Sequence, residues 1–454
     1  MAHCNLGHAL QRQGRLAEAL ASFKAALTIQ PDFGGAWQNY IFCLNYASGY
    51  SAQTIFEEHV KFGSRFEEAV AGLKRAHGIE RDPGKRLKIG YVSPDFRAHA
   101  VAYFIEPVLE RHAREGFEIY CYFSSVAADA VTQRLKAKVH HWREISAQPD
   151  GEVAELIRRD GIDILVDLAG HTAGNRLGVF AHKPAPVQAT WLGYVCTTGL
   201  GSIDCRITDV NADPVGLSER YYIEELVRLP DTFVCYRPSD HSPAVDALPG
   251  LKNGQVTFAS FNNLAKMTPE VRKLWAQVLL AVPGARLMLK TKGLNDARMR
   301  QQLVEDFARH DVPDHRLELV AWDDSYSQHL NRYNEVDIGL DPFPCNGGTT
   351  SFDAMWMGVP VVTLAGNSFI SRMGVSMLTS LGLTELVAQT PEEYVAIASR
   401  LAGDLDRLAA LRAGLRERMA NSPLTDAKRF TLNLEKAYRE MWITWCGGSR
   451  GEAR

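Results

Sequence analysis

The sequence has 454 residues, of which 46% are hydrophobic and 23% are charged; this is an ordinary soluble composition, but the length exceeds one compact core. Its net charge of −3, from 50 basic and 53 acidic residues without a basic block, argues against nucleic acid or an anionic membrane as a main partner. The eight cysteines form no CxxC pair, and we find no signal peptide and no span of ~18 apolar residues. We therefore expect about three domains in a reduced, cytoplasmic protein with no membrane segment.

The first residues follow a helical repeat pattern. Leucine, phenylalanine and small residues recur at the spacing of the 34-residue tetratricopeptide repeat, namely at Leu6, Gly7, Leu10, Gly14, Ala19, Phe23, Ala26 and Pro31. The small residues allow two antiparallel helices to approach, and Leu6, Leu10 and Phe23 are expected to fill the gap between them. Further helices are expected at 34–47 and, after a Ser51 cap, at 52–76. Because one repeat cannot bury its own faces, we expect a short array or the end of a longer one. It serves either as a protein-binding superhelix or as a helical packing collar.

Two series of alternating strands and helices follow a polar linker at 77–86. The first series has strand-like runs at 87–92, 117–123, 163–168, 187–192 and 205–208. The second has them at 256–261, 285–290, 316–320, 336–340, 359–364 and 385–388. Thr268-Pro269-Glu270 is a helix start in the second series, and the last helix is expected at about 424–445. Such alternation predicts two parallel, doubly wound sheets, in which ligands bind beyond the carboxyl ends of the strands. We place a helical region at 1–80 and two Rossmann-like domains at 85–248 and 252–445, with the last helix free to pack back on the first of these.

One loop has the composition of an anion site. Gly347 and Gly348 stand between the strand at 336–340 and a predicted helix, and Thr349, Thr350 and Ser351 follow. Glycines permit close approach of a ligand to the backbone, and the N–H groups of a helix start bind phosphate oxygens. The stretch is neither a P-loop nor a Rossmann fingerprint, and a turn followed by an ordinary Ser/Thr cap is the alternative.

Three other strand ends carry unusual polar residues. The loop after 87–92 contains His99, the loop after 163–168 contains His171, and the loop after 256–261 contains Lys266. Each residue alone is more often a hydrogen-bonded loop histidine or a surface lysine than a catalytic group. Together with the glycine loop they place two histidines in one sheet and a cation with an anion site in the other.

These phrases resemble the O-linked N-acetylglucosamine transferases, in particular bacterial relatives in which tetratricopeptide repeats precede a two-lobed transferase. The resemblance covers nearly the whole chain, and its motifs stand in the same order. They are the residues 90–96 with His99, residues 184–194, residues 261–264 with Lys266, and residues 345–350 with Asp353. The resemblance implies a GT-B fold, UDP-N-acetylglucosamine as donor, inversion at the anomeric carbon, and neither metal nor cofactor.

The resemblance also implies roles for individual residues. Lys266 is similar to the lysine that meets the diphosphate, and Thr349 and Thr350 to its partners at the helix start beside Gly347 and Gly348. The remaining donor contacts implied are Asp353 at the ribose, His329 beside the uracil, Asn263 near the uridine, and Thr198 and Gly199 at the sugar, with His99 on the sugar and acceptor side. Two positions depart from the animal enzymes, which have histidine in place of Gly348 and glutamine in place of Asn263.

The chemistry of the residues agrees with this assignment. A leaving diphosphate gains negative charge, and a transferase without metal stabilises it with fixed cations and dipoles, which Lys266 and the helix at Thr349 can supply. A metal-using transferase would carry a loop Asp-x-Asp, but the only such triplet, 404–406, lies in a helical, solvated stretch. The base for the acceptor hydroxyl stays open among His99, His171, the less favoured Asp160, and a phosphate oxygen of the substrate.

The expected function is therefore transfer of N-acetylglucosamine from its UDP donor to Ser or Thr hydroxyls of proteins, with protein acceptors engaged in part by the repeats. Three alternatives remain: an N-glucosyltransferase that uses UDP-glucose on asparagine, a tetratricopeptide adaptor with an inactive transferase lobe, and a sugar-nucleotide epimerase.

Overall fold

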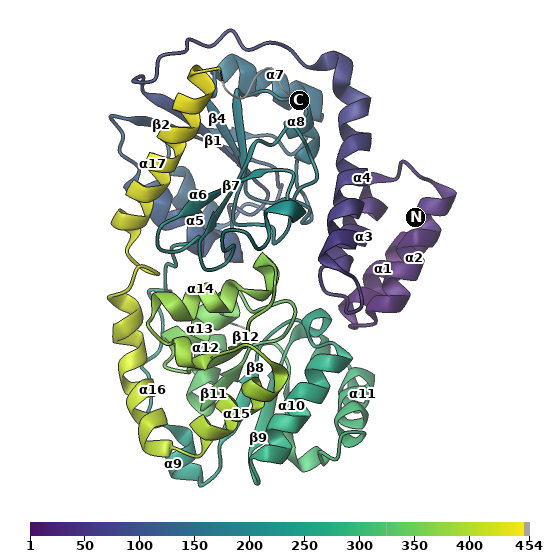
Figure 1. Ribbon diagram of the computed structural model, residues 1–454, viewed down its shortest axis with the longest axis vertical. Helices are drawn as coiled ribbons and strands as arrows, with labels where there is room; N and C mark the ends of the chain where they lie inside the picture. Colours follow the sequence, from purple (N-terminus) through teal and green to yellow (C-terminus); the bar gives the residue numbers. More distant parts are fainter. Residues whose placement is uncertain (324, 449–454) are drawn as a thin grey trace. The chain divides into compact units, whose positions relative to one another are not determined.

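The computed structural model describes residues 1–323 and 325–448, and its chain forms two compact units (Figure 1). One unit comprises Met1–Tyr50 and Pro238–Leu424, and the other comprises Ser51–Arg237 and the described residues from Thr425 onward. Each unit contains one parallel sheet with helices, which confirms the two Rossmann-like domains expected from the alternating pattern. The helices of the predicted region 1–80 are shared between the two units.

The helical repeat begins the first of these units. It consists of α1 (Ala2–Arg12), α2 (Leu16–Ile29) and α3 (Gly34–Leu44). A Cβ on Gly7 would lie 2.6 Å from the ring of Phe23. The close approach of α1 and α2 therefore depends on the absence of a side chain at Gly7. Leu10 and Phe23 are buried between the helices, but Leu6 is 51% exposed and does not fill the gap as predicted. It therefore lies on the exposed side of α1.

The rest of this unit is built on a six-stranded parallel sheet in the order β10-β9-β8-β11-β12-β13. Its strands are β8 (Thr257–Ser260), β9 (Arg286–Lys290), β10 (Leu317–Val320), β11 (Ile338–Leu340), β12 (Val361–Leu364) and β13 (Val387–Ala388). Its helices are α9 (Pro249–Asn253), α10 (Pro269–Ala281), α11 (Ala297–Ala308), α12 (Tyr326–Asn331), α13 (Thr349–Trp356), α14 (Met373–Ser380), α15 (Pro391–Ala402) and α16 (Leu405–Ala420). Thr268 caps α10 and Pro269 opens it, as predicted.

The other unit carries a seven-stranded parallel sheet in the order β3-β2-β1-β4-β5-β6-β7. Its strands are β1 (Leu87–Ser93), β2 (Phe117–Phe123), β3 (His141–Glu144), β4 (Ile164–Asp167), β5 (Val187–Thr190), β6 (Cys205–Asp209) and β7 (Glu225–Leu229). Its helices are α4 (Ala52–Val70), α5 (Ala100–Arg111), α6 (Ala130–Lys136), α7 (Asp150–Asp160), α8 (Leu177–Ala181) and α17 (Ala427–Cys446). Helix α17 packs on α5, β5 and β7, and its Leu434, Tyr438 and Trp442 belong to the core of this unit.

The strand order reverses once in each sheet, and this determines where ligands bind. The reversal lies between β1 and β4 in one sheet and between β8 and β11 in the other. In open parallel sheets, ligands bind beyond the carboxyl ends of the strands at such a switch point. The loops with His99 and His171 follow β1 and β4, and the loops with Lys266 and Gly347 follow β8 and β11. The four loops singled out in the sequence are therefore the switch-point loops.

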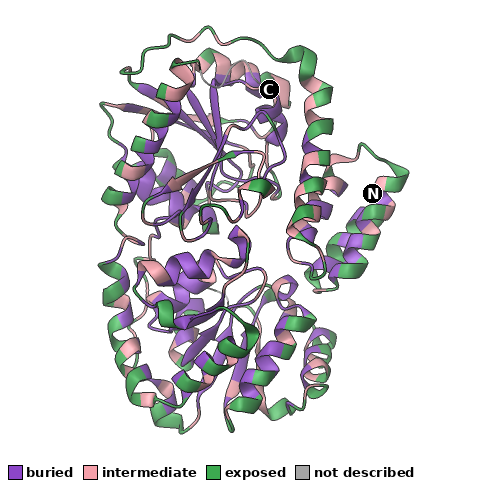
Figure 2. Cartoon of the chain, viewed as in Figure 1, coloured by how far each residue is buried: buried purple, intermediate pink, exposed green. Residues whose placement is uncertain are grey.

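Two strands were missed by the sequence patterns. Both β3 and β7 are edge strands and are only partly buried, and β3 reads His-Trp-Arg-Glu. The inner strands β4, β5, β8 and β12, by contrast, are buried along their whole length, and β1, β2 and β9 are buried at all but one position (Figure 2). Fewer positions of an edge strand are buried, so fewer of them need to be apolar. Its sequence therefore lacks the continuous apolar run that marks the inner strands.

Two further observations concern the described residues. In residues 1–323 and 325–448 no helix combines the length and the apolar character needed to cross a membrane. Asp404 and Asp406 are exposed, and Asp404 caps α16 by accepting the backbone N–H of Arg407 at 3.0 Å. The only Asp-x-Asp triplet of the sequence therefore lies on the surface, as expected.

Candidate active site

The glycine loop leads from β11 into α13, as the sequence predicts. Gly348 is the N-cap of α13 and Thr349 is its first residue. The N–H groups of a first helical turn have no carbonyl of the same helix to bind, so those of Thr349 and Thr350 are suited to an anion. A Cβ on Gly347 would lie 2.2 Å from Ser351 Oγ, whereas space around Gly348 is open. Glycine is thus required at 347, and position 348 has room for a side chain.

A buried carboxylate holds this loop in shape. Asp341, just after β11, accepts hydrogen bonds from the backbone N–H of Gly347 at 2.6 Å, from Ser351 Oγ at 3.3 Å and from Thr363 Oγ1 at 2.7 Å. Burial raises the pKa of Asp341 to about 6, although these hydrogen bonds favour the ionised form. The strand, the loop, the helix start and the neighbouring strand β12 are therefore joined at one side chain.

Lys266 reaches the same loop from the end of β8. Its Nζ donates to the carbonyl oxygen of Asn346 at 2.6 Å. The preceding turn is shaped by Asn263, whose side-chain oxygen accepts the N–H of Ala265 at 3.0 Å. A second link joins the two loops, because Thr350 Oγ1 donates to Asn262 Oδ1 at 3.1 Å. The cation and the helix start are thus neighbours, as the resemblance implies.

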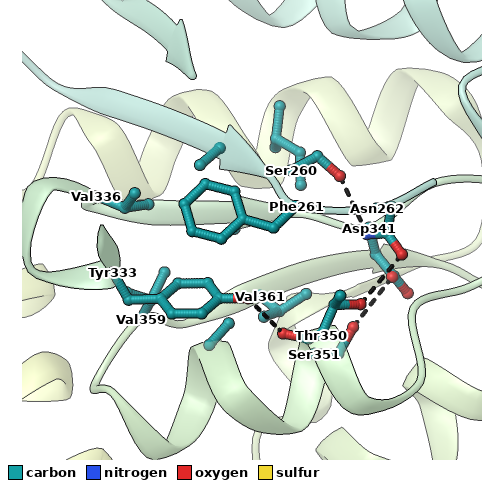
Figure 3. A pocket seen from close by; sticks show the side chains of 14 residues that line it. Ser260, Phe261, Asn262, Tyr333, Val336, Asp341, Thr350, Ser351, Val359 and Val361 are labelled. Carbon is teal, nitrogen blue, oxygen red and sulfur yellow. Dashed lines mark hydrogen bonds between the residues drawn. The ribbon is translucent and has the colours of Figure 1, made fainter. Parts of the chain in front are cut away.

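A small cavity lies behind these loops (Figure 3). Its volume is about 20 Å³, which is room for about one water molecule and not for a nucleotide. Phe261 and Tyr333 pack against each other on one side with ring centroids 4.5 Å apart, and Tyr333 donates to the carbonyl oxygen of Thr350 at 3.1 Å. The aromatic side chains that line the cavity therefore support the glycine loop from the interior of the unit.

A cluster of aromatic and charged side chains surrounds His329 on α12. The ring of Trp322 lies 5.5 Å from that of His329, nearly parallel to it. Tyr326 donates to Asp353 Oδ1 at 2.7 Å, and His329 Nε2 lies 3.7 Å from Asp353 Oδ2. Two of the predicted donor contacts, His329 and Asp353, are therefore adjacent.

Lys290 completes this cluster, and sequence reasoning missed it. Its Nζ lies 2.6 Å from Asp323 Oδ2 and 2.5 Å from His329 Nδ1, and its side chain is fully buried. Burial lowers the pKa of Lys290, while Asp323 opposes that shift. An ammonium can only donate, so His329 Nδ1 accepts and the ring proton of neutral His329 is on Nε2. The available signal was a lysine that ends the apolar strand β9.

In the other unit, His99 caps helix α5. Its Nδ1 accepts the backbone N–H of Val101 at 3.3 Å and lies 3.6 Å from Asp95 Oδ1. Burial lowers the pKa of His99, and Asp95 opposes that shift. The side chain is still 40% exposed, so it can contact a substrate.

His171 has a different environment. Its Nε2 donates to the carbonyl oxygen of Thr198 at 2.8 Å, and its ring is packed against the rings of His59, Phe62 and Tyr194. Nδ1 is buried and is one of the side-chain atoms with no hydrogen-bond partner in the described chain. Burial lowers the pKa of His171 well below its ordinary value.

The loop with His171 is organised in the same way as the glycine loop. Asp167 at the end of β4 accepts the N–H groups of Ala169 at 3.1 Å and Gly170 at 2.8 Å, and also Thr190 Oγ1 at 2.8 Å. Burial raises the pKa of Asp167 to about 6. In both sheets a buried aspartate at the switch point thus ties a strand-end loop to a threonine of the next strand.

Thr198 and Gly199, the predicted sugar contacts, follow β5 in the same unit. Thr198 is buried, and Glu224 accepts both its backbone N–H, at 2.7 Å, and its hydroxyl. Gly199 has a φ of +77°, which favours glycine. The predicted site residues therefore fall into two groups. One unit contains His99, His171, Thr198 and Gly199. The other contains Lys266, Gly347, His329 and the remaining predicted donor contacts.

Comparison with known proteins identifies the family of the chain. The model of glycosyl transferase family 41 matches residues 73–249 and 244–434, and a tetratricopeptide repeat model matches residues 1–33. A solved structure of a Thermobaculum terrenum O-GlcNAc transferase mutant is 40% identical, with a TM-score of 0.93 over 98% of this chain and 85% of that chain.

Plant proteins are similar over most of the chain. The probable UDP-N-acetylglucosamine–peptide N-acetylglucosaminyltransferase SPINDLY of Petunia hybrida is 43% identical over 93% of this chain and 46% of its own length. The Arabidopsis thaliana protein of the same name is 42% identical over 92% of this chain and 46% of its own length. The chain therefore spans about half the length of these curated relatives. The family model covers both sheets and all four switch-point loops, and the chain belongs to glycosyl transferase family 41.

Proposed function

We propose that the chain is an inverting, metal-independent transferase that moves N-acetylglucosamine from UDP-N-acetylglucosamine to serine or threonine hydroxyls of proteins. The observation that carries this proposal is the helix start at Thr349 and Thr350 with Lys266 beside it, at the switch point of a doubly wound sheet. Membership of family 41 and the names of the relatives support a UDP-sugar donor and a peptide acceptor.

The leaving group accounts for the first part of the mechanism. When the glycosidic bond to the diphosphate breaks, negative charge develops on the phosphate oxygens. The ammonium of Lys266 and the first-turn N–H groups of α13 are fixed before the reaction, so they stabilise this charge without reorganising. The nearby carboxylates already have partners, since Asp341 binds Gly347 and Thr363 and Asp353 binds Tyr326. This supports a leaving-group site made of cations and dipoles, with no cofactor.

The nucleoside end fits the cluster around His329. We assign Asp353 to the ribose hydroxyls and the rings around His329 to the uracil, with Trp322, which is stacked on buried His329, as the exposed ring of this cluster. Because Lys290 occupies Nδ1, the Nε2–H of neutral His329 is the group that can donate. Asn263 lies in the turn before Lys266, and we assign it to the uridine because the family resemblance implies that role.

On the acceptor side, the hydrogen bonds argue for His99 as a donor. Its Nδ1 accepts from Val101, so the proton of the neutral ring is on Nε2, and this nitrogen can donate but cannot take a proton. His171 has a free lone pair on Nδ1, but burial lowers its pKa well below the ordinary value, which disfavours it as a base. We therefore favour a phosphate oxygen of the donor as the proton acceptor, with His99 orienting the sugar or the hydroxyl.

The acceptor partners and the location belong to the same proposal. We infer that α1, α2 and α3 contribute to the binding of protein acceptors, in keeping with the repeat match at residues 1–33. All eight cysteines are free thiols, which is in keeping with a reducing, cytoplasmic setting.

The proposal is tested with the purified chain, UDP-N-acetylglucosamine and a Ser/Thr acceptor peptide. We expect UDP release and a peptide mass increase of one N-acetylhexosamine, both strongly reduced by Lys266→Met. Lys273→Met, at an exposed lysine on α10, is the matched control and should behave as the wild type. A folded chain with neither donor hydrolysis nor transfer would refute the proposal.

Competition binding and the product distinguish the alternatives. Preference for UDP-glucose with modification of asparagine would replace the proposal by an N-glucosyltransferase. Tight peptide binding without UDP binding would indicate an adaptor, and conversion of the free nucleotide sugar to its epimer would indicate an epimerase.

A further inference from the structure

One face of α4 lies on the segment that contains Thr198 and Gly199. Helix α4 comes from the region predicted as helical repeats, yet it belongs to the same compact unit as the seven-stranded sheet. His59, Gly63 and Glu67 are spaced four residues apart, so they share one face of the helix. All three contact residues 194–202, the segment between β5 and β6.

The centre of this contact is backbone against backbone. A Cβ on Gly63 would lie 1.7 Å from the carbonyl oxygen of Gly199, and a Cβ on Gly199 would lie 2.0 Å from the carbonyl oxygen of His59. No side chain fits at such distances, and the obstructing atoms are main-chain atoms that cannot rotate away. Both positions therefore require glycine, and the helix and the loop share one fixed separation.

Two polar side chains of α4 fix the orientation of the same segment. The carboxylate of Glu67 accepts the backbone N–H groups of Ser202 at 2.7 Å and Gly201 at 3.2 Å. His59 donates from Nδ1 to the carbonyl oxygen of Ile55 at 2.6 Å and accepts the Tyr194 hydroxyl at Nε2 at 2.7 Å. The His59 side chain is buried, so its hydrogen bonds are not shared with bulk water.

The sheet holds the opposite side of the segment. Glu224 accepts Thr197 Oγ1 at 2.6 Å and the N–H of Thr198 at 2.7 Å, and Arg206 donates to the carbonyl oxygens of Tyr194 and Cys196 at 2.9 and 3.0 Å. The backbone of Thr198 and Gly199 thus lies between side chains of the sheet domain and the face of α4. Removal of either side would release it.

We propose that α4 is a positioning element of the transferase site, which sets the place of the Thr198–Gly199 backbone through His59, Gly63 and Glu67. This rests on the proposed function, in which that backbone contacts the donor sugar. A displacement of about 1 Å at a reacting group can lower the rate about a hundredfold. A methyl group at Gly63 demands a shift of more than 1 Å, because ordinary contacts of a Cβ start near 3 Å.

The test compares Gly63→Ala with Gly72→Ala. Gly72 follows α4 and has no atom within 4 Å of an added Cβ, so its variant is the matched control for the same chemical change. Glu67→Gln, a smaller change that keeps the shape of the side chain, is paired with Glu68→Gln at the exposed neighbour. The measurements are kcat and KM with UDP-N-acetylglucosamine, the Kd of UDP, and hydrogen exchange at Gly201 and Ser202.

We expect Gly63→Ala to lower kcat about a hundredfold and Glu67→Gln to lower it several-fold. Both should leave the Kd of UDP unchanged, because the glycine loop, which we assign to the diphosphate, belongs to the other compact unit. Exchange at Gly201 and Ser202 should accelerate in both variants and in neither control. Wild-type kcat and wild-type exchange in Gly63→Ala would overturn the proposal, as would equal losses in the variants and their controls.

Failure of the proposed function is distinguishable from failure of this proposal. If the wild type transfers no sugar, the transferase assignment fails, and hydrogen exchange alone still decides whether α4 holds the loop. If the wild type is active and Gly63→Ala loses UDP binding together with kcat, the effect is general unfolding, and the positioning role is rejected.

Discussion

Replacement of Asp341 by asparagine should separate the stability of the chain from its affinity for UDP. Asp341 is fully buried and accepts three hydrogen bonds around the glycine loop, from Gly347, Ser351 and Thr363. Asparagine has nearly the same shape and no charge. The variant therefore keeps the packing. It loses the negative charge that strengthens the hydrogen bonds from these three donors and that attracts the ammonium of Lys266.

The magnitude follows from the pKa of Asp341. Burial raises it from 3.8 to about 6, and two units correspond to about 3 kcal/mol. The folded chain then binds the proton more tightly than the unfolded chain, so the wild type loses this stability as the pH rises through the window from about 4 to about 6. About half of it, ~1.5 kcal/mol, is lost between about pH 5 and pH 7.5. Asparagine does not titrate, so the variant avoids that loss.

The assay is urea unfolding of both proteins at pH 5 and pH 7.5, with UDP titration at pH 7.5. Between pH 5 and pH 7.5, the unfolding free energy of Asp341→Asn should rise by about 1.5 kcal/mol relative to that of the wild type. Asp167 titrates in the same window but is present in both proteins, so it cancels. UDP affinity should fall about tenfold, since a lost hydrogen bond to a charged group contributes about 1.4 kcal/mol.

The exposed cap Asp404→Asn is the control, with no pH-dependent difference expected. Parallel pH dependences of wild type and Asp341→Asn, or an unchanged UDP affinity, would refute the reasoning about Asp341.

Substitutions at three other residues test other parts of the site. Lys266→Met should lower turnover by about 10²–10³-fold, because it removes a fixed charge at the leaving group; UDP release measures this, and near-native rates would exclude Lys266 from the mechanism. Lys290→Met leaves the carboxylate of Asp323 with only the partly exposed Arg332 as a cation, so the unfolding free energy should fall by about 2 kcal/mol and UDP should bind more weakly. Calorimetry measures both, and unchanged UDP affinity would separate Lys290 from donor binding. His99→Asn should keep the thermal stability, because asparagine is a good N-cap, but should lower the rate of transfer; His99→Leu should lose about 1 kcal/mol of stability as well. Equal stability of the two His99 variants would contradict the capping role.

The sequence patterns were most successful where a short stretch carries its own physical requirement. The inner strands are apolar runs because they are buried on both faces, and the switch-point loops are recognisable because glycine and polar residues follow such runs directly. Gly347 illustrates this well, since the requirement for glycine arises from Ser351 and Asp341, only a few residues away. Prediction was weakest where one partner lies far along the chain. Lys290 is an ordinary lysine at a strand end until Asp323 and His329 approach it, and Leu6 matched the repeat pattern but lies on an outer face.

The two histidines show most clearly which properties the sequence alone determined. Composition, order of motifs and strand-end position were enough to place His99 and His171 in switch-point loops of the same doubly wound sheet. Only the tertiary structure decided what each ring can do, because protonation depends on the neighbours that folding brings within hydrogen-bond distance. The backbone N–H of Val101 donates to Nδ1 of His99. The ring of His171 is instead enclosed by side chains of α4 and bonded to the carbonyl oxygen of Thr198. The same folding turned Gly63, an unremarked glycine in a predicted helix, into the point where that helix meets Gly199.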